Sequence, residues 1–517
     1  MKFNFVNNID AYKIGHKDQY PDGLQEVLSN LTARGSRLEG INEVVFFGLQ
    51  AFLDDLQESF EEFLASDVDE VCAAYEKNIT EILGPNSVGS LHIRELHELG
   101  YLPLEFCALP EGARVNLKVP LFTMRNTDAR FGWLVNYLET WISAQIWLAS
   151  TSATTAAQFR GLLESWAEET GSPIESVDFQ AHDFSMRGMS SLEAAAASGA
   201  GHLLSFLGSD VLPAKDWVKR HYDAQEPILL SVPATEHSVM CAGGNETELE
   251  TYDRLLDLYT NDDPNTPDGI VSVVSDTWDL WKVITKILPQ LKEKILGRDG
   301  KLVIRPDSGD PADILCGLNS NANYLWDTKG TLVGSPEEKG VIELLWEIFG
   351  GTINEKGFKV LDPHIGAIYG DSITNDRADD ICRRLAAKGF ASCNVVFGIG
   401  SYTYQYKTRD SLMFAVKATN VVINGEDIAI FKDPITDSGT KRSARGHLAV
   451  HYELEQGFYL VDNLTRDQVA SEENWLAPVW VNGKFLQRYT FDQVKWNTKA
   501  IIPAHPSVQY IIDGVKV

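Results

Sequence analysis

Residues 302–309 read Leu-Val-Ile-Arg-Pro-Asp-Ser-Gly, a short β-branched run that ends abruptly in polar and turn-forming residues. Three more segments share this pattern: Val271-Ser-Val-Val-Ser-Asp276, Ala367-Ile-Tyr-Gly-Asp-Ser372 and Asn394-Val-Val-Phe-Gly-Ile-Gly-Ser401. Helical patterns lie between them, at residues 278–295, 341–349 and 374–387. Strands that alternate with helices in this way are typical of βαβ units and a parallel sheet. We therefore predict an α/β fold, with its chemistry at the carboxyl ends of the strands.

The flanking regions have different patterns. Apolar residues between Phe52 and Leu64 keep helical spacing among acidic residues, which predicts an amphipathic helix. A second apolar stripe, from Phe131 to Ile142, predicts one side of a long buried helix. From about residue 411 onward, strand patterns such as 428–431 and 448–452 dominate. We interpret this stretch as a β-rich region that packs with parts of the N-terminal third.

Length and charge narrow the function classes. The chain has 517 residues and a formal net charge of −28, which disfavours nucleic acid and anionic membranes as partners because both would repel it. The N-terminal residues lack the apolar core of a secretory signal, and no window approaches 18 apolar residues. The six cysteines show no metal-binding spacing. These features predict a protein of the reducing cytoplasm.

Several strand-end residues have the chemistry of a phosphate or metal site. Arg305 can grip a phosphate with two donors, and Asp307 can bind a metal ion or ribose hydroxyls. Gly370 allows a ligand to approach the backbone, and Asp371 follows it at the start of a helix. The residues of segments 305–309 and 370–372 are also common in turns and at helix N-caps, so neither segment indicates a function by itself. The segment Gly398-Ile-Gly-Ser401 lacks the third glycine of a dinucleotide fingerprint.

Three candidates lie outside these strands. Phe184 could stack on a flat ring and Arg187 could bind phosphate, although a buried Phe and a surface Arg would give the same sequence. His237 and Asp210 taken singly are as consistent with structural roles. Together with the strand-end residues, they indicate a site for a phosphorylated sugar and a flat heterocycle, with Mg²⁺.

At these residues the chain resembles the family of nicotinate and nicotinamide phosphoribosyltransferases. The resemblance extends in order over nearly the whole chain, through Asp10-Ala-Tyr-Lys13, Phe47-Gly-Leu-Gln50, Leu109-Pro-Glu-Gly112, His182-Asp-Phe184, Arg187-Gly188, Ser231-Val-Pro-Ala234, Glu236-His-Ser238, Val271–Asp276, Ile304–Gly309, Gly370-Asp371, Thr408-Arg-Asp410 and Phe431-Lys-Asp-Pro434. It implies the transfer of a phosphoribosyl group from 5-phosphoribosyl-1-pyrophosphate to nicotinamide, with release of nicotinamide mononucleotide and pyrophosphate. It also implies a homodimer with shared active sites.

The resemblance implies a division of the chain as well. Residues 151–410 would form a barrel-like parallel β/α catalytic domain. Residues 1–150 and 411–517 would form the second, β-rich domain, and the N-terminal segment would contribute to the dimer interface.

The resemblance also implies a role for each residue of this sequence that matches a motif of the family. The pyridine ring would lie between Phe184 and the partner's Tyr12, and Asp210 would accept a hydrogen bond from the carboxamide. Phosphate or pyrophosphate would be held by Arg187, Arg305 and the partner's Arg409, with Arg34 and Lys417 as weaker candidates. Asp307 would bind ribose or Mg²⁺, with Asp276 nearby. The ribose-phosphate site would be completed by the strand-end residues Ser272, Gly370, Asp371, Gly400 and Ser401.

His237 matches the family's histidine that ATP phosphorylates, which implies ATP as a stimulating co-substrate. Two departures concern substrate affinity: Gly398-Ile-Gly-Ser-Tyr402 replaces a Gly-Ser-Gly-Gly-Gly run, and Ser185-Met186 replaces Gly-Tyr. Three alternatives remain open at this point. They are a nicotinate-specific enzyme, a non-catalytic nucleotide-binding protein, and an aldolase-type barrel, which would require a strand-end lysine.

Overall fold

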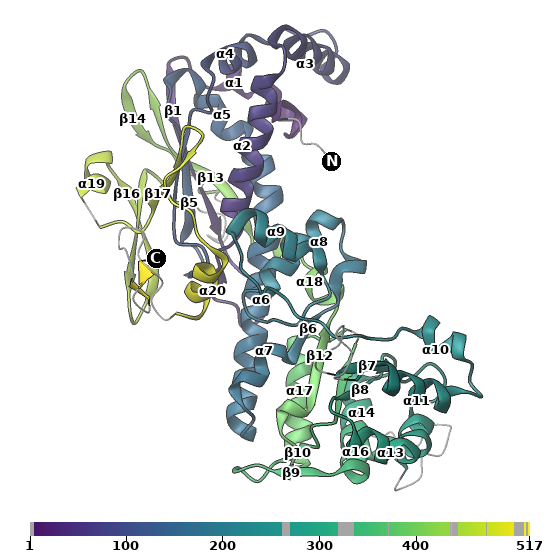
Figure 1. The fold of residues 1–517 in the computed structure, drawn as a ribbon. Coiled ribbons are helices and arrows are strands. Elements are labelled where there is room, and N and C mark those ends of the chain that lie inside the picture. Colours follow the sequence, from purple (N-terminus) through teal and green to yellow (C-terminus); the bar gives the residue numbers. More distant parts are fainter. Residues whose placement is uncertain are drawn as a thin grey trace. The chain divides into compact units, whose positions relative to one another are not determined.

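The computed structural model describes residues 5–260, 269–318, 335–370, 372–434, 436, 443–471 and 473–500, and the backbone of 511–512 and 515–516. Contacts divide the chain into two compact units (Figure 1). Unit 1 contains Met1–Thr154, Asp216–Gln225 and Lys407–Val517, and unit 2 contains Thr155–Lys215 and Glu226–Tyr406. No helix within the described ranges is long and apolar enough to cross a bilayer.

A five-stranded parallel sheet forms the centre of unit 2. Its order is β6-β12-β11-β8-β7, with β6 at Ala181–Asp183, β7 at Val271–Val274, β8 at Leu302–Arg305, β11 at Ile365–Tyr369 and β12 at Val395–Ile399. β7 is buried along its whole length, because helices cover one face and the other faces the interior. The four β-branched runs predicted as strands are therefore confirmed.

Short extended segments continue the sheet from β6 round to β7. Parallel bridges join Asp183 to Ser209, Gly208 to Leu230, and Ala234 to Ser272. Backbone hydrogen bonds support each bridge, including Asp183 N to Gly208 O (3.1 Å), Ser209 N to Leu230 O (3.1 Å) and Thr235 N to Ser272 O (2.9 Å). Because β6 and β7 are the two edges of the sheet, these bridges close it into a ring. The predicted barrel-like parallel β/α domain is confirmed.

Helices follow the strands of unit 2 as predicted, with one difference. α16 (Val341–Phe349) and α17 (Asn375–Ala387) match the predicted segments. The segment predicted as one helix over 278–295 is divided into α12 (Leu280–Lys282), a π-helical turn (Val283–Ile287) and α13 (Leu288–Gly297). Pro289 lies in the first turn of α13, and its missing N–H removes one ladder bond of a continuous helix. The other α-helices of unit 2 are α7 (Val177–Gln180), α8 (Leu192–His202), α10 (His237–Gly243), α11 (Glu248–Leu258), α14 (Pro311–Cys316), α15 (Pro336–Lys339) and α18 (Ser401–Tyr404).

Unit 1 is built on a seven-stranded antiparallel sheet in the order β14-β13-β1-β5-β3-β17-β18. The strands are β1 (Leu24–Ala33), β3 (Leu104–Ala108), β5 (Pro120–Asn126), β13 (Phe414–Ile423), β14 (Glu426–Ala429), β17 (Ala477–Val481) and β18 (Lys484–Phe485). The N-terminal β1 pairs with the C-terminal β13 from Leu24↔Ile423 to Ala33↔Phe414. The predicted second domain, β-rich and assembled from both ends of the chain, is confirmed.

Helices and hairpins complete unit 1. α2 (Leu49–Ala65) and β15 (His447–Glu453) contain the segments predicted for them, whereas β14 ends at Ala429 and so precedes the predicted strand 428–431 by two residues. The apolar stripe from Phe131 to Ile142 is buried as predicted, but Leu138 separates α5 (Gly132–Tyr137) from α6 (Glu139–Thr170). The remaining elements include α1 (His16–Gln19), β2 (Glu43–Val45), α3 (Val68–Leu83), α4 (Leu91–Leu99), β4 (Arg114–Asn116), β16 (Gly457–Leu464), α19 (Arg466–Ser471) and α20 (Phe491–Lys499), and α9 (Leu212–Tyr222) enters this unit from unit 2.

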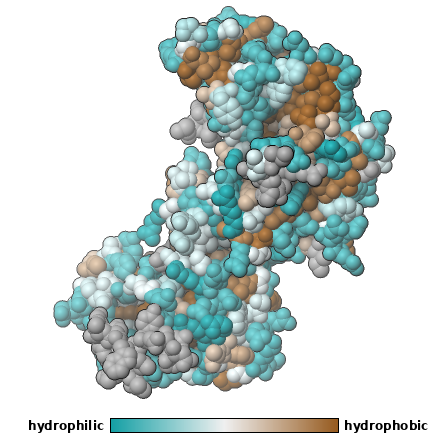
Figure 2. All heavy atoms as spheres, turned by 180° about the vertical axis from the view of Figure 1, so that it is seen from behind, coloured by the Kyte–Doolittle hydropathy of each residue, from teal (hydrophilic) through white to brown (hydrophobic). Residues whose placement is uncertain are grey.

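Hydrophobic side chains reach the surface as well as the core. Figure 2 shows them gathered into patches on the face drawn there. Large apolar residues of unit 1 that are more than half exposed are Tyr12, Leu91, Phe431, Leu454 and Leu486.

Candidate active site

The strand ends of β7, β8 and β11 place four predicted residues together. Arg305 is the last residue of β8, and its Nη2 lies 3.9 Å from Asp307 Oδ2. Asp276, after β7, accepts hydrogen bonds on Oδ2 from Asp307 N (3.0 Å) and Ser308 Oγ (2.6 Å). A Cβ at Gly370, after β11, would lie 2.6 Å from Asp307 Oδ1 and 3.3 Å from Arg305 Nε. Glycine is therefore needed there because the two side chains rest against its backbone.

Several polar atoms of this cluster have no partner. Arg305 Nε, Asp276 Oδ1 and Ser272 Oγ are buried, and none bonds to another atom of the described residues. A buried polar atom without a partner is costly, so such atoms indicate a ligand that completes them. No three His, Cys, Asp or Glu side chains in the described ranges converge as a complete metal site. In proteins, Mg²⁺ is generally held by one or two carboxylates together with phosphate oxygens of a substrate, and Asp276 and Asp307 have the chemistry of such carboxylates.

His237 faces this cluster from a separate helix. It is the first residue of α10, and its Nδ1 lies 3.1 Å from Thr277 Oγ1 while its Nε2 lies 3.9 Å from Asp307 Oδ2. Nearly half of its side chain (48%) is exposed. His237 therefore lies beside the strand-end cluster, as expected of residues that share one site.

Phe184 follows β6 and lies beside the same arginine. The Arg305 guanidinium is 5.8 Å from the centre of the Phe184 ring, a cation–π distance. The ring of His182 lies 4.7 Å from that of Phe184. A Cβ at Gly398 would lie 2.9 Å from Phe184 Cδ2, so this glycine gives the ring its space. Phe184 is thus held between strand ends, with the Arg305 guanidinium nearby.

Asp210 is placed by the first closing bridge of the barrel. Its Oδ1 accepts from His182 Nε2 (2.9 Å) and from Ser231 Oγ (2.5 Å). Burial opposes ionisation of this carboxyl, but the hydrogen bond and charge of His182, the Ser231 hydroxyl and the Arg305 charge outweigh it. The pKa of Asp210 is therefore lowered from its ordinary value, and the group is an ionised acceptor at neutral pH.

The remaining predicted residues of unit 2 lie on a 3₁₀ turn after β6 and at the start of α18. Arg187 is exposed on the 3₁₀ turn Ser185–Gly188 after β6. A Cβ at Gly188 would lie 2.0 Å from Ser401 Oγ, so the turn contacts the start of α18, which follows Gly400. Asp371 lies outside the described residues.

The predicted residues of unit 1 form a separate group. Tyr12 is 66% exposed on the 3₁₀ turn Ala11–Gly15. Arg34 and Lys417 line a cavity of about 350 Å³ together with Lys118. Burial lowers the pKa of Lys417; Glu139, 3.9 Å away, opposes this, and the positive charges of Arg34, Lys432 and Arg409 lower the pKa further. This cationic cluster is suited to an anion, and its service to a neighbouring chain stays a prediction.

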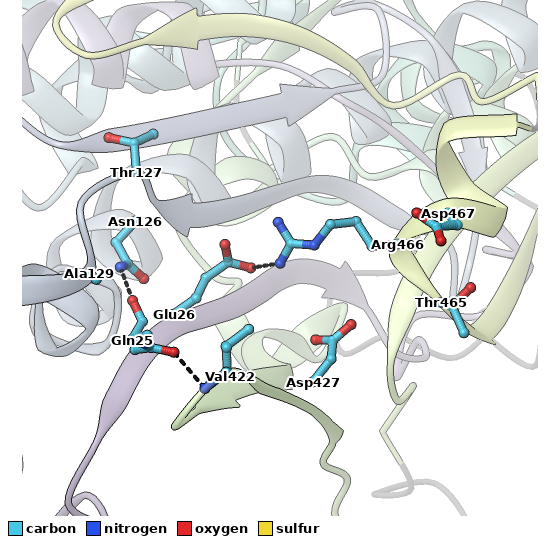
Figure 3. A pocket seen from close by; sticks show the side chains of 11 residues that line it. Gln25, Glu26, Asn126, Thr127, Ala129, Val422, Asp427, Thr465, Arg466 and Asp467 are labelled. Carbon is cyan, nitrogen blue, oxygen red and sulfur yellow. Dashed lines mark hydrogen bonds and ion pairs between the residues drawn. The ribbon is translucent and has the colours of Figure 1, made fainter.

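A larger cavity, of about 620 Å³, contains none of the predicted residues (Figure 3). It lies in unit 1 between β1, β13, β14 and the start of α19. Its carboxylates Glu26 and Asp427 are already bonded, Glu26 to Arg466 (2.7 Å) and Asp427 to His447 (2.9 Å). The strand ends of unit 2, with their orphaned polar atoms, remain the better candidate.

His182, Ser231 and Thr277 were not predicted as site residues. For His182, the strand period of two was a usable signal, because it places residues 182 and 184 on the same face. Ser231 and Thr277 follow no such pattern, since they reach Asp210 and His237 across the barrel closure and a loop.

Solved structures place the fold in a known class. The nicotinate-nucleotide pyrophosphorylase of Pyrococcus furiosus superposes with a TM-score of 0.56 at 14% identity, covering 96% of this chain and 95% of that one. At this identity the likeness shows a shared fold alone.

Sequence comparisons are more specific. Residues 179–472 match the nicotinate phosphoribosyltransferase (NAPRTase) family, and residues 4–105 match the nicotinamide phosphoribosyltransferase N-terminal domain. The chain is 47% identical over 508 residues to the nicotinamide phosphoribosyltransferase of Acinetobacter baylyi, covering 96% of this chain and 97% of that one. It is 33% identical to the enzyme of that name from Xanthomonas campestris, covering 96% and 98%. The chain belongs to the nicotinate phosphoribosyltransferase family.

Proposed function

We propose that this protein is a nicotinamide phosphoribosyltransferase. It transfers the phosphoribosyl group of 5-phosphoribosyl-1-pyrophosphate to nicotinamide, which yields nicotinamide mononucleotide and pyrophosphate for NAD salvage. The observation that carries the choice of base is Asp210, an acceptor held ionised beside Phe184 and Arg305. A carboxamide N–H can donate to it, whereas the carboxylate of nicotinate would be repelled.

The strand ends supply what this reaction requires. The pyridine nitrogen carries no proton, so no general base is needed. Departure of pyrophosphate from C1 builds positive charge on the ribose and negative charge on the leaving group. Arg305 stabilises the leaving group, and its orphaned Nε provides an additional donor. Phe184 holds the ring near C1, which converts the encounter of two substrates into a local step.

Asp276 and Asp307 hold Mg²⁺, which supplies positive charge to the pyrophosphate when bound. The orphaned Oδ1 of Asp276 supports this assignment. Asp307 Oδ1 faces Gly370, where the ribose hydroxyls of the substrate could also reach it.

His237 accepts the γ-phosphoryl group of ATP in this proposal. A bond forms between Nε2 and phosphorus, the bond to ADP breaks, and water later releases phosphate from the imidazole. Thr277 supports the step because its hydroxyl holds Nδ1 and so leaves Nε2 facing Asp307. This position beside the strand-end cluster supports the proposed stimulation by ATP.

The working assembly is a homodimer of the cytoplasm. The exposed side chain of Tyr12 and the cationic cluster around Lys417, both in unit 1, support a second copy as the source of Tyr12, Arg34, Arg409 and Lys417. The six cysteines form no disulfide, which agrees with a reducing compartment.

An incubation of pure protein with phosphoribosyl pyrophosphate, Mg²⁺ and either base tests the proposal, with products resolved by mass. We expect nicotinamide mononucleotide as the main product. Product from nicotinate alone would make the protein a nicotinate enzyme. No product from either base, with or without ATP, would favour the non-catalytic alternative.

A further inference from the structure

The carboxylate of Asp210 is held asymmetrically. Both described side-chain donors, His182 Nε2 and Ser231 Oγ, reach the same oxygen, Oδ1. The donors come from opposite sides, because His182 lies on β6 and Ser231 lies on the closing segment after residue 230. Oδ2 is left as the oxygen that can accept from a ligand.

The donor on His182 has a defined position. A carboxylate only accepts hydrogen bonds, so Nε2 carries the proton. The imidazole is 12% exposed and lies against Phe184 on one side. A Cβ at Gly208 would come within 2.9 Å of His182 Nδ1, so the ring also rests on the backbone of the neighbouring barrel segment. This packing aims Nε2 at Asp210.

Resting on the proposed function, we propose that His182 and Ser231 are specificity-determining residues that act through Asp210. By donating to Oδ1 they keep Asp210 an acceptor, which selects the amide over the acid. When a donor is lost, protonated Asp210 becomes more populated and can donate to a carboxylate, so nicotinate is admitted. They are positioning residues because neither needs to touch the base.

The groups that face Asp210 fix the direction of the pH effect. They are His182 from β6, Ser231 from the closing segment and Arg305 from β8, and all three favour the ionised carboxylate. Lower pH populates protonated Asp210, which can donate to the carboxylate of nicotinate. Nicotinate use should therefore increase as the pH falls, and nicotinamide use should not. Without one donor, the same increase occurs at a higher pH.

The test measures kcat/KM for both bases between about pH 5 and pH 8. The variants are Ser231→Ala and His182→Leu, which remove a donor, and Ser231→Thr and His182→Gln, which retain one. A hydrogen bond to a charged group is worth roughly a tenfold change in an equilibrium or more. We expect the ratio of kcat/KM for nicotinate to kcat/KM for nicotinamide to rise roughly tenfold in the variants that remove a donor. In the variants that retain a donor, the ratio should return toward that of the parent protein.

His364→Gln is the matched control, because His364 pairs with Asp362 (2.7 Å) in the same unit without contacting Asp210. The nicotinate-to-nicotinamide ratio of His364→Gln, and the pH profile of that ratio, should match those of the parent protein. The inference is overturned if Ser231→Ala and His182→Leu lower the use of both bases equally, with no change in the pH profile of the ratio. That result would leave the proposed function intact, provided that the parent protein forms nicotinamide mononucleotide. A parent that used nicotinate alone would instead remove the proposed function.

Discussion

Gly370→Ala should damage catalysis without damaging the fold. The added methyl would lie 2.6 Å from Asp307 Oδ1, whereas ordinary van der Waals contact begins at 3.4 Å. The carboxylate must therefore move by roughly 0.8 Å, the difference between those two distances. Arg305 Nε, at 3.3 Å from the methyl, leaves little room for the move. A displacement of about 1 Å in a reacting geometry costs on the order of 100-fold in rate.

The assay is the initial rate of nicotinamide mononucleotide formation as phosphoribosyl pyrophosphate is varied. The value of kcat/KM for phosphoribosyl pyrophosphate should fall, while the midpoint of thermal unfolding changes little. Gly366→Ala is the matched control on the same strand, since its methyl would meet Lys301 Cδ at 3.4 Å and Val303 Cγ2 at 4.0 Å, which are ordinary van der Waals contacts. If Gly370→Ala stayed within twofold of the control, the strand-end cluster would not be the pyrophosphate site.

Three further predictions concern separate groups. Asp210→Ala should lower kcat/KM for nicotinamide by about 10- to 100-fold, through loss of a charged hydrogen bond, and an equal loss with nicotinate would refute its role. His237→Ala should abolish stimulation by ATP and retain basal turnover, because Nε2 is the proposed acceptor; unchanged coupling to ATP would contradict this. Glu111 is buried in unit 1 and its pKa is raised to about 7 by desolvation, despite bonds from Gln50, Tyr222 and Gly48. Since its folded pKa exceeds its unfolded one, it binds a proton more tightly in the folded state. The free energy of unfolding should therefore fall, by up to about 3 kcal/mol, as the pH rises from about 4.5 through 7. Urea titrations at several pH values would detect this dependence. Glu111→Gln should remove most of it.

The strands were predictable from sequence because burial on both faces requires continuous β-branched runs. Val271–Val274 is buried along its whole length and carries that signal, while Leu302–Arg305 alternates between buried and half-buried positions. The closing bridges at Gly208 and Ala234 were not predictable, because single bridges leave no periodicity. The barrel was expected only through the family resemblance.

The strand-end residues of the site were predictable for the same reason, since the ends of parallel strands meet at one edge. Arg305, Asp307 and Gly370 followed from their places after strands. The partners of Asp210 did not, because they reach it across the closure of the barrel. A contact of this kind depends on the tertiary fold and leaves no local pattern.

A crystal structure with nicotinamide mononucleotide bound would show directly whether the strand ends of the barrel form the active site. We expect a pyridine ring stacked on Phe184, a carboxamide nitrogen about 2.7–3.2 Å from Asp210 Oδ2, and Arg305 beside the ribose-phosphate end of the molecule. A nucleotide bound away from the strand ends of β7, β8 and β11, or a carboxamide turned away from Asp210, would contradict it.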